Sequence, residues 1–188
     1  MDHPTHRIDL HAACEFLNGG GLIAYPTEAV WGLGCDPFNE DAVRKILALK
    51  GRPAEKGLIV VASGFDQISE LLIDLPKIQT DLLLETWPGP TTWLIPDSKG
   101  LFPRWIKGQH DCIAMRVSAH PIVRKLCKLF GKPIVSTSAN RTGGKEIKSK
   151  LNLELQFADK VDYIVEGELG GRSSPSEIRD LLTGAVIR

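Results

Sequence analysis

Gly19-Gly20-Gly21-Leu22-Ile23-Ala24-Tyr25 is a stretch in which a helical pattern stops and an apolar strand begins. Residues 8–17, just before it, carry apolar side chains at helical spacing, and the three glycines are a strong stop signal. The next four residues are apolar and have the length of a short buried strand. The same exchange of helix and strand recurs along the chain, and it predicts a layered α/β domain.

Working outward from this stretch, the chain contains further elements of both kinds. Helices are expected from Asn39, as N-cap, to Lys50-Gly51, near 65–72 and 78–85, and from Pro121, at a first helical position, to Gly131. Strands are expected over 58–62, 91–95, 113–117, 133–136 and 163–165, and a closing hairpin over 178–188. A rigid turn at Trp87-Pro88-Gly89-Pro90 favours a mixed sheet over a purely parallel one. Segments 97–111 and 141–150 are expected to be loops.

Length and composition set limits on the class of protein. The 188 residues fit one domain, and 43% hydrophobic with 24% charged residues is ordinary for a globular protein. The formal net charge is zero, so the chain as a whole does not attract nucleic acid electrostatically. Any RNA contact would need a local basic patch, with the acidic residues gathered elsewhere. No apolar stretch approaches the roughly 18 residues of a membrane span, and we expect a cytoplasmic protein with no membrane contact.

The four cysteines predict no metal site and no disulfide. They form no C-x-x-C pair and lie near no histidine at zinc-finger spacing. Three lie in apolar surroundings, and Cys35 lies in a glycine-rich loop. We expect reduced thiols, as in a cytosolic protein.

Cations gather where the second helix is expected to end. Lys50-Gly51-Arg52-Pro53, followed by Lys56, places three of them within seven residues. Such groups supply charge to phosphate, and arginine can do so bidentately. The alternatives are a solvated surface or, for Lys50, a charge that complements the helix C-terminus. No Walker A pattern occurs in the chain.

Hydroxyl groups gather after a strand in the second half of the chain. Ser136-Thr137-Ser138-Ala139-Asn140 holds three hydroxyls and an amide, which exceeds what a turn requires and favours ligand binding. Together with the cations near residue 50, this segment predicts a nucleotide phosphate site on loops at strand ends.

Two further positions are candidates for ligand contact. Arg116 lies within an apolar strand, so it needs either a ligand or a structural carboxylate as its partner. The segment 25–34 follows a buried strand, and its glycines open the backbone to a ligand, with Thr27 offering a hydroxyl and Trp31 a stacking face. The alternative is a plain connection with a turn hydroxyl. No covalent nucleophile is evident, which favours chemistry by positioning and charge stabilisation.

Taken in order, these motifs resemble one family. Tyr-Pro-Thr-Glu-x-x-x-Gly-Leu-Gly, Lys-x-Arg-Pro, Ala-x-Arg-Val, Ser-Thr-Ser-Ala-Asn and a late Pro-Ser-Glu-Ile-Arg-Asp follow one another along the chain. The set is similar to that of the YrdC/TsaC family of threonylcarbamoyl-AMP synthases. The match runs from about residue 7 to the end, so the resemblance implies one YrdC-like catalytic domain over 7–188, with residues 1–6 as an N-terminal tail.

The resemblance implies both a fold and a reaction. The fold would be a twisted, open, mixed α/β sheet with flanking helices and a concave, positively charged face. The enzyme would be a nucleotidyltransferase that converts L-threonine, bicarbonate and ATP into threonylcarbamoyl-adenylate and pyrophosphate, with Mg²⁺ carried mainly by the ATP phosphates and no protein metal site. Partner proteins would use the product to modify adenosine in tRNA, and direct contact with tRNA or double-stranded RNA is a further possibility.

Residue roles follow from the same resemblance. Lys50 and Arg52 would be catalytic, and the ATP-binding residues would be Lys50, Arg52, Lys56, Ser138, Asn140 and Arg188. L-Threonine would be held by Thr27, Arg116, Ser136 and Ser176, with Arg116 on its carboxylate. The chain departs from many members at Ala29, where they carry Thr or Ser, and from some at Val61, where they carry His. Both positions lie at the amino-acid pocket in those members.

Two other functions compete with this interpretation. One is a non-catalytic module that binds tRNA or rRNA through the same basic surface, against which the neutral net charge weighs. The other is the carbamoyl-adenylate chemistry of hydrogenase-maturation carbamoyltransferases, which are much longer chains.

Overall fold

The computed structural model of the chain describes residues 9–188. The predicted tail, 1–6, and the predicted domain start at residue 7 lie outside the described residues, as does the first residue of the helix expected over 8–17. No helix in the described part of the chain is both long enough and apolar enough to cross a membrane.

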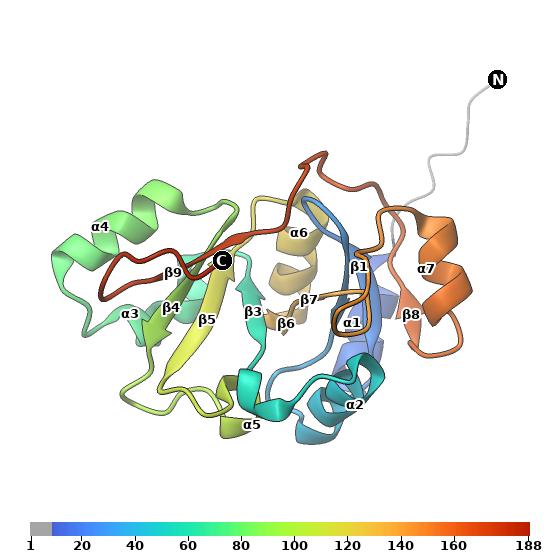
Figure 1. Cartoon of the computed structure of the whole chain (residues 1–188), viewed down its shortest axis with the longest axis horizontal. Helices are drawn as coiled ribbons and strands as arrows, with labels where there is room; N and C mark the ends of the chain where they lie inside the picture. The colour runs from blue at the N-terminus through green and yellow to red at the C-terminus, as the bar shows by residue number, and fades with distance from the viewer. Residues whose placement is uncertain (1–8) are drawn as a thin grey trace.

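The strands form two mixed sheets that lie side by side (Figure 1). The four-stranded sheet has the order β7-β2-β1-β8, with β7 (Thr137–Ser138), β2 (Trp31–Gly34), β1 (Ile23–Pro26) and β8 (Tyr163–Ile164). The five-stranded sheet has the order β6-β3-β5-β4-β9, with β6 (Ile134–Val135), β3 (Ile59–Ala62), β5 (Cys112–Val117), β4 (Thr91–Pro96) and β9 (Glu177–Asp180). Both sheets mix parallel and antiparallel pairs. The predicted mixed α/β class is therefore confirmed.

The division into two sheets differs from the single sheet expected from the sequence. Its physical origin lies at Ser136. The strand before it, β6, pairs with β3, and the strand after it, β7, pairs with β2. One continuous segment thus contributes an edge strand to each sheet and joins them at a single residue.

The helices begin and end at the signals that the sequence carries. They are α1 (Leu10–Asn18), α2 (Glu40–Lys50), α3 (Ser69–Leu72), α4 (Lys77–Thr86), α5 (Arg104–Lys107), α6 (Pro121–Phe130) and α7 (Lys150–Phe157), with 3-10 turns η1 (Ala54–Lys56) and η2 (Phe65–Ile68). The Asn39 side chain caps α2 by accepting a hydrogen bond from Ala42 N at 3.0 Å. Gly51 and Gly131 end α2 and α6 in the left-handed conformation. The sequence did not predict β2, β7, α5 or α7.

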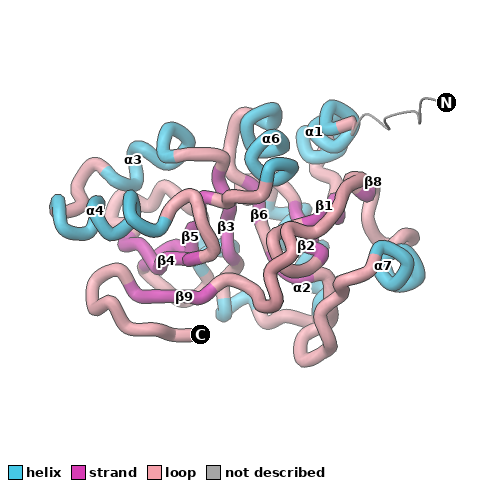
Figure 2. The backbone as a smooth tube through the Cα atoms, turned by 90° about the horizontal axis from the view of Figure 1, so that it is seen from above, coloured by secondary structure: helices cyan, strands magenta, loops and turns pink. Residues whose placement is uncertain are grey.

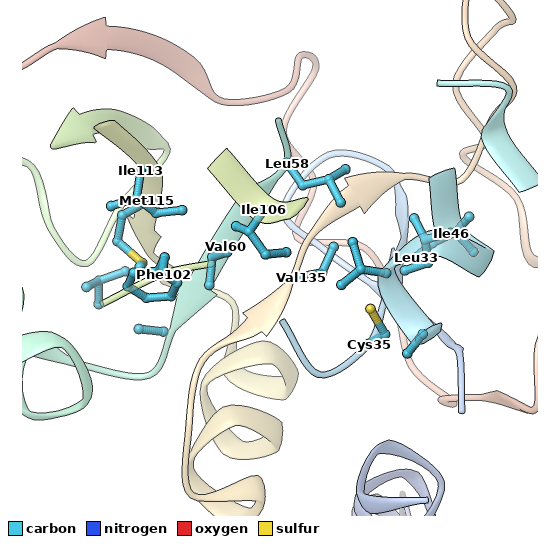
Figure 3. Close-up of a cluster of buried hydrophobic side chains, with 14 of the residues drawn as sticks. Leu33, Cys35, Ile46, Leu58, Val60, Phe102, Ile106, Ile113, Met115 and Val135 are labelled. Carbon is cyan, nitrogen blue, oxygen red and sulfur yellow. The ribbon is translucent and has the colours of Figure 1, made fainter. Parts of the chain in front are cut away.

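Helices α1, α3 and α6 lie along one side of the molecule, and the C-terminal strand β9 runs along the opposite side (Figure 2). The larger apolar core continues beneath both sheets. It extends from Ile113 and Met115 on β5, through Val135 on β6, to Leu33 on β2 and Ile46 on α2 (Figure 3). A second apolar cluster packs α1 and α6 against β1 and β3. This continuous core fixes the relative placement of the two sheets, and with it the space between them.

Candidate functional site

A pocket of about 480 Å³ is lined by residues from both sheets and from the loops that follow their strands. All ten residues proposed from the sequence as ligand contacts line it: Thr27, Lys50, Arg52, Lys56, Arg116, Ser136, Ser138, Asn140, Ser176 and Arg188. Ala29 lines it as well, whereas Val61 does not and is fully buried in the core. Trp31, expected as a stacking face, is also buried in the core. The fold thus converts segments scattered over the chain into one cavity.

Arg52 lies in the loop after α2 and is bonded to backbone carbonyls. Its Nε and Nη2 atoms donate to Gly57 O at 3.0 and 2.9 Å, and Nη2 also donates to Lys56 O at 3.4 Å. It makes no ion pair with a carboxylate in the described part of the chain. Burial and the neighbouring Arg188 lower the pKa of Arg52. A guanidinium held by carbonyls and left without an anion is suited to receive an anionic ligand.

Lys50, the last residue of α2, is buried beside Arg52. Its Nζ atom donates to Ser138 O, to Asn140 O at 2.7 Å and to Asn140 Oδ1 at 3.4 Å. Burial and the charge of Arg52 lower the pKa of Lys50 to about 8. The side chain therefore does more than complement the helix end, because it connects α2 to the segment after β7.

The Ser138–Asn140 segment is further held by its own side chains. Ser138 Oγ donates to Asn140 Oδ1 at 2.5 Å, and Asn140 Nδ2 donates to Gly144 O at 2.6 Å. Thr142 N donates to Lys50 O at 2.9 Å. One of the predicted cations, Lys50, is thus bonded directly to the predicted hydroxyl segment, so the two parts of the expected phosphate site are in contact.

Arg116 on β5 has the structural carboxylate that was one of its two predicted partners, and it also lines the pocket. Its Nη1 atom lies 2.6 Å from Glu28 Oε1, and both side chains are nearly buried. Burial alone would raise the pKa of Glu28, but the charge and hydrogen bond of Arg116, with a hydrogen bond from Ser118, lower it to about 2. Arg116 Nε has no hydrogen-bond partner among residues 9–188. The guanidinium therefore keeps donors that Glu28 does not use.

The remaining hydroxyls on this side of the pocket are oriented by close neighbours. Thr27 Oγ1 donates to Val30 O at 2.6 Å, which closes the turn between β1 and β2. Ser176 Oγ accepts from the buried Thr92 at 3.0 Å, and Ser176 O accepts from Arg188 at 3.3 Å. Ser176 thus retains its own proton for another acceptor.

The pocket has an excess of positive charge within a chain that is neutral overall. Seven cations line it (Lys50, Arg52, Lys56, Lys107, Arg116, Arg172 and Arg188), against two carboxylates, Glu28 and Glu146. Lys107 is paired with Asp97 at 2.7 Å and Arg116 with Glu28. The local basic patch that an anionic ligand requires is therefore present. In residues 9–188, three or more His, Cys, Asp or Glu side chains nowhere gather into a cluster that could hold a metal ion.

Sequence reasoning assigned no role to several residues of this site. Glu28 stood in a quoted motif without one, and Arg172 was not singled out. Cys112 lines the pocket beside Ala114 and Arg116, and the alternation along β5 could have placed it there, because residues two apart share one face of a strand. The four cysteines are free thiols, and Cys35, which follows the last residue of β2, is fully buried.

The mixed two-sheet fold and its pocket lined by cations and hydroxyls define an α/β protein with a cationic cavity between its sheets. A family model, Sua5/YciO/YrdC, described as "Telomere recombination", matches residues 15–188. The chain belongs to this Sua5/YciO/YrdC family.

Relatives and solved structures agree with this assignment. The chain is 56% identical over 176 residues to the threonylcarbamoyl-AMP synthase of Pseudomonas aeruginosa (strain UCBPP-PA14), covering 94% of each. Sua5 of P. abyssi, solved in complex with L-threonine, superposes with a TM-score of 0.87 at 35% identity over 95% of this chain. This chain spans about half, 53%, of that protein. E. coli YciO superposes with a TM-score of 0.84 at 25% identity, covering 95% of this chain and 87% of that one.

Proposed function

We infer that this chain is a threonylcarbamoyl-AMP synthase. The enzyme uses ATP, L-threonine and bicarbonate, and it releases pyrophosphate with threonylcarbamoyl-adenylate. The observation that carries the inference is the single pocket lined by all ten residues proposed from the sequence. The 56% identity to the P. aeruginosa synthase over nearly the whole chain supports the same reaction. These findings do not favour a non-catalytic RNA-binding module.

The proposed chemistry follows from the charges that form and move. The threonine amine and bicarbonate form a carbamate with loss of water, and a carbamate oxygen attacks the α-phosphorus of ATP while pyrophosphate leaves. Negative charge builds on the phosphates during this step, and preorganised cations stabilise it. Arg52 and Lys56 are proposed to contact the phosphates, with the charge of Lys50 beside them, and Ser138, Asn140 and Arg188 to face the nucleotide.

The amino acid is proposed to lie on the other side of the pocket. Arg116 would bind its carboxylate with the guanidinium donors that Glu28 leaves free, while Thr27, Ser136 and Ser176 would contact the rest of the molecule. Ala29 supplies no hydroxyl there, so Thr27 and Ser176 are the proposed compensating groups. A pocket that encloses both substrates would also keep water from the adenylate, which hydrolyses easily.

Mg²⁺ is proposed to enter on the nucleotide. This ion keeps several waters and commonly binds proteins through substrate phosphates, so no dedicated protein cage is required. The product is proposed to pass to proteins that transfer the threonylcarbamoyl group to tRNA. Direct contact with tRNA or double-stranded RNA remains a separate proposal, which a salt titration of binding would test, because binding through backbone phosphates weakens steeply with salt.

Pyrophosphate release from ATP tests the proposed reaction. We expect release that depends on both L-threonine and bicarbonate, each omitted in turn, with threonylcarbamoyl-adenylate detected by mass spectrometry. Release without threonine would indicate another acceptor, and no release in the complete mixture would refute the proposal.

A further inference from the structure

Lys50 has a hydrogen-bonding environment unlike that of the other cations in the pocket. An ammonium group has three N–H donors and no acceptor. Three oxygen atoms surround the Lys50 ammonium: Ser138 O, Asn140 O at 2.7 Å and Asn140 Oδ1 at 3.4 Å. The residue is only 4% exposed. Its donors are therefore all engaged within the protein, and a phosphate would have to displace one of these acceptors.

Arg52, two residues further on, differs in this respect. Its hydrogen bonds use Nε and Nη2, so the donors on Nη1 remain for a ligand. The two cations of the Lys-x-Arg motif thus have separate geometries. Lys50 donates its hydrogen bonds within the protein, whereas Arg52 keeps donors available at the pocket.

The bonds between Lys50 and the segment it faces run in both directions. Lys50 Nζ binds oxygen atoms of Ser138 and Asn140, while Lys50 O accepts from Thr142 N at 2.9 Å. In residues 9–188 no carboxylate forms an ion pair with Lys50. Three oxygen acceptors therefore converge on one buried cation. Without that cation the acceptors would repel one another and lose their hydrogen bonds, which is unfavourable in a buried site.

We propose that Lys50 is a positioning residue, which fixes the conformation of Ser138 and Asn140 and does not itself touch the triphosphate. The proposal rests on the proposed nucleotide site, and it deepens that site by dividing the Lys-x-Arg motif into a residue that holds the segment and a residue that contacts the ligand. Lys50 then affects ATP binding through Asn140. Once Asn140 has been replaced, replacing Lys50 should have little further effect on ATP affinity.

A double-mutant cycle tests this link. ATP affinity is measured by calorimetry without threonine for the parent, Lys50→Met, Asn140→Ala and the double variant. We expect each single change to weaken ATP by roughly 10- to 100-fold, the cost of unsatisfied buried groups. The double variant should lose little more than the larger single loss, because coupled residues are not additive. Losses that multiply would overturn the proposal.

Two further variants separate positioning from direct charge contact. Lys50→Arg keeps the charge but cannot place three donors on the same oxygens, so we expect it to bind ATP as poorly as Lys50→Met. Restoration of parent affinity by arginine would indicate a direct charge contact. In hydrogen exchange of the ligand-free proteins, Lys50→Met should speed exchange over 136–144 by about tenfold or more. The matched control Lys56→Met, which removes an exposed cation of the same pocket, should leave that exchange unchanged.

A measurement on the parent protein avoids any folding defect of the variants. NMR of the lysine ammonium groups, with a non-hydrolysable ATP analogue added, should show Lys50 Nζ still protected and without coupling to ³¹P. A ¹⁵Nζ–³¹P coupling at Lys50 would overturn the proposal. Absence of ATP binding by the parent would count against the proposed function. The hydrogen-exchange data on the ligand-free proteins would still test whether Lys50 fixes the conformation of residues 136–144.

Discussion

Glu28 Oε1 lies 2.6 Å from Arg116 Nη1 and also accepts hydrogen bonds from Ser118 Oγ at 2.7 Å and Ala119 N at 3.2 Å. One carboxylate oxygen thus joins the turn after β1 to the end of β5 and to the connection between β5 and α6. Because a buried charge is costly unless it is paired, this contact holds the proposed threonine-binding arginine at the pocket wall.

The pair predicts a specific loss of stability in acid. Folding lowers the pKa of Glu28 from 4.5 to about 2, so the folded state keeps this carboxylate ionised where the unfolded chain is already protonated. Its stabilising contribution is complete above pH 4.5 and is lost as the pH falls toward 2. Between pH 6 and pH 2.5, the free energy of unfolding of the parent should fall by roughly 2–3 kcal/mol more than that of Glu28→Gln. Urea unfolding at several pH values in this range measures the free energy of unfolding of both proteins. If the two free energies fall in parallel with pH, the prediction is wrong.

Arg52→Ala should reduce activity without unfolding the protein. Removing one preorganised charge contact costs about 2–4 kcal/mol of transition-state stabilisation, or on the order of 30- to 1,000-fold in rate. The control is Arg44→Ala on the neighbouring helix α2, because Arg44 is exposed and, within residues 9–188, pairs with Glu40 alone, one turn away. Pyrophosphate release assays should show near-parent activity for the control. An Arg52→Ala rate within a few-fold of the parent would refute this role.

Gly57 and Gly51, on either side of Arg52, can be compared by substitution. Both have positive φ, at 61° and 57°, but ψ is 176° at Gly57 and 39° at Gly51, so only Gly51 is in the left-handed helical conformation. An alanine Cβ at Gly57 would lie 2.8 Å from Lys107 O, whereas at Gly51 it would meet nothing within 4 Å. We expect Gly51→Ala to lose about 1–2 kcal/mol from the left-handed backbone alone. Gly57→Ala should lose roughly 1–3 kcal/mol more, because its backbone conformation is essentially restricted to glycine and because the added Cβ is overpacked. Chemical denaturation measures both. Equal losses of unfolding free energy in the two variants would contradict this prediction.

Asp97 and Asp111 provide a second comparison, of a buried with an exposed ion pair. Lys107 Nζ lies 2.7 Å from Asp97 Oδ2, with both side chains buried, whereas Asp111 pairs with Arg104 at 3.1 Å and is 94% exposed. Asp97→Ala would leave Lys107 buried without its partner and also remove acceptors for Leu101 N and Phe102 N, a loss of roughly 3–5 kcal/mol. Asp111→Ala should change stability little. Similar unfolding midpoints for the two variants would contradict this.

Local sequence signals predicted most of the helices and strands. They failed where contacts between residues far apart in the sequence determine the local structure. Helices α2 and α6 were predicted because Asn39 and Pro121 mark their starts and Gly51 and Gly131 their ends. Strand β2 was missed because it contains two glycines, which are unfavourable in strands. A Cβ at Gly34 would lie 2.7 Å from the Tyr25 ring and 2.8 Å from Val135 O, so tertiary packing requires the glycine.

The same division applies to the site. Residue types and order predicted which side chains line the pocket, since clustered cations and hydroxyls imply phosphate chemistry wherever they occur. The sequence could not reveal that Arg116 takes Glu28, 88 positions earlier, as its partner. Nor could it reveal that Lys50 is bonded to Asn140, because nothing local marks a contact across 90 residues. Helix α7 was missed because its three leucines, 151, 153 and 155, alternate as in a strand and do not follow helical spacing, and only Leu153 is buried.

The passage of the chain from one sheet to the other at Ser136 bears on how the protein should respond to its ligands. Residues from both sheets line the pocket, so a molecule that contacts Arg116 and Ser138 together would bridge two halves that are otherwise connected through the core and a few strands. Such a bridge acts as a non-covalent crosslink. Nucleotide and amino acid bound at once should therefore raise the melting temperature by more than the sum of their separate effects.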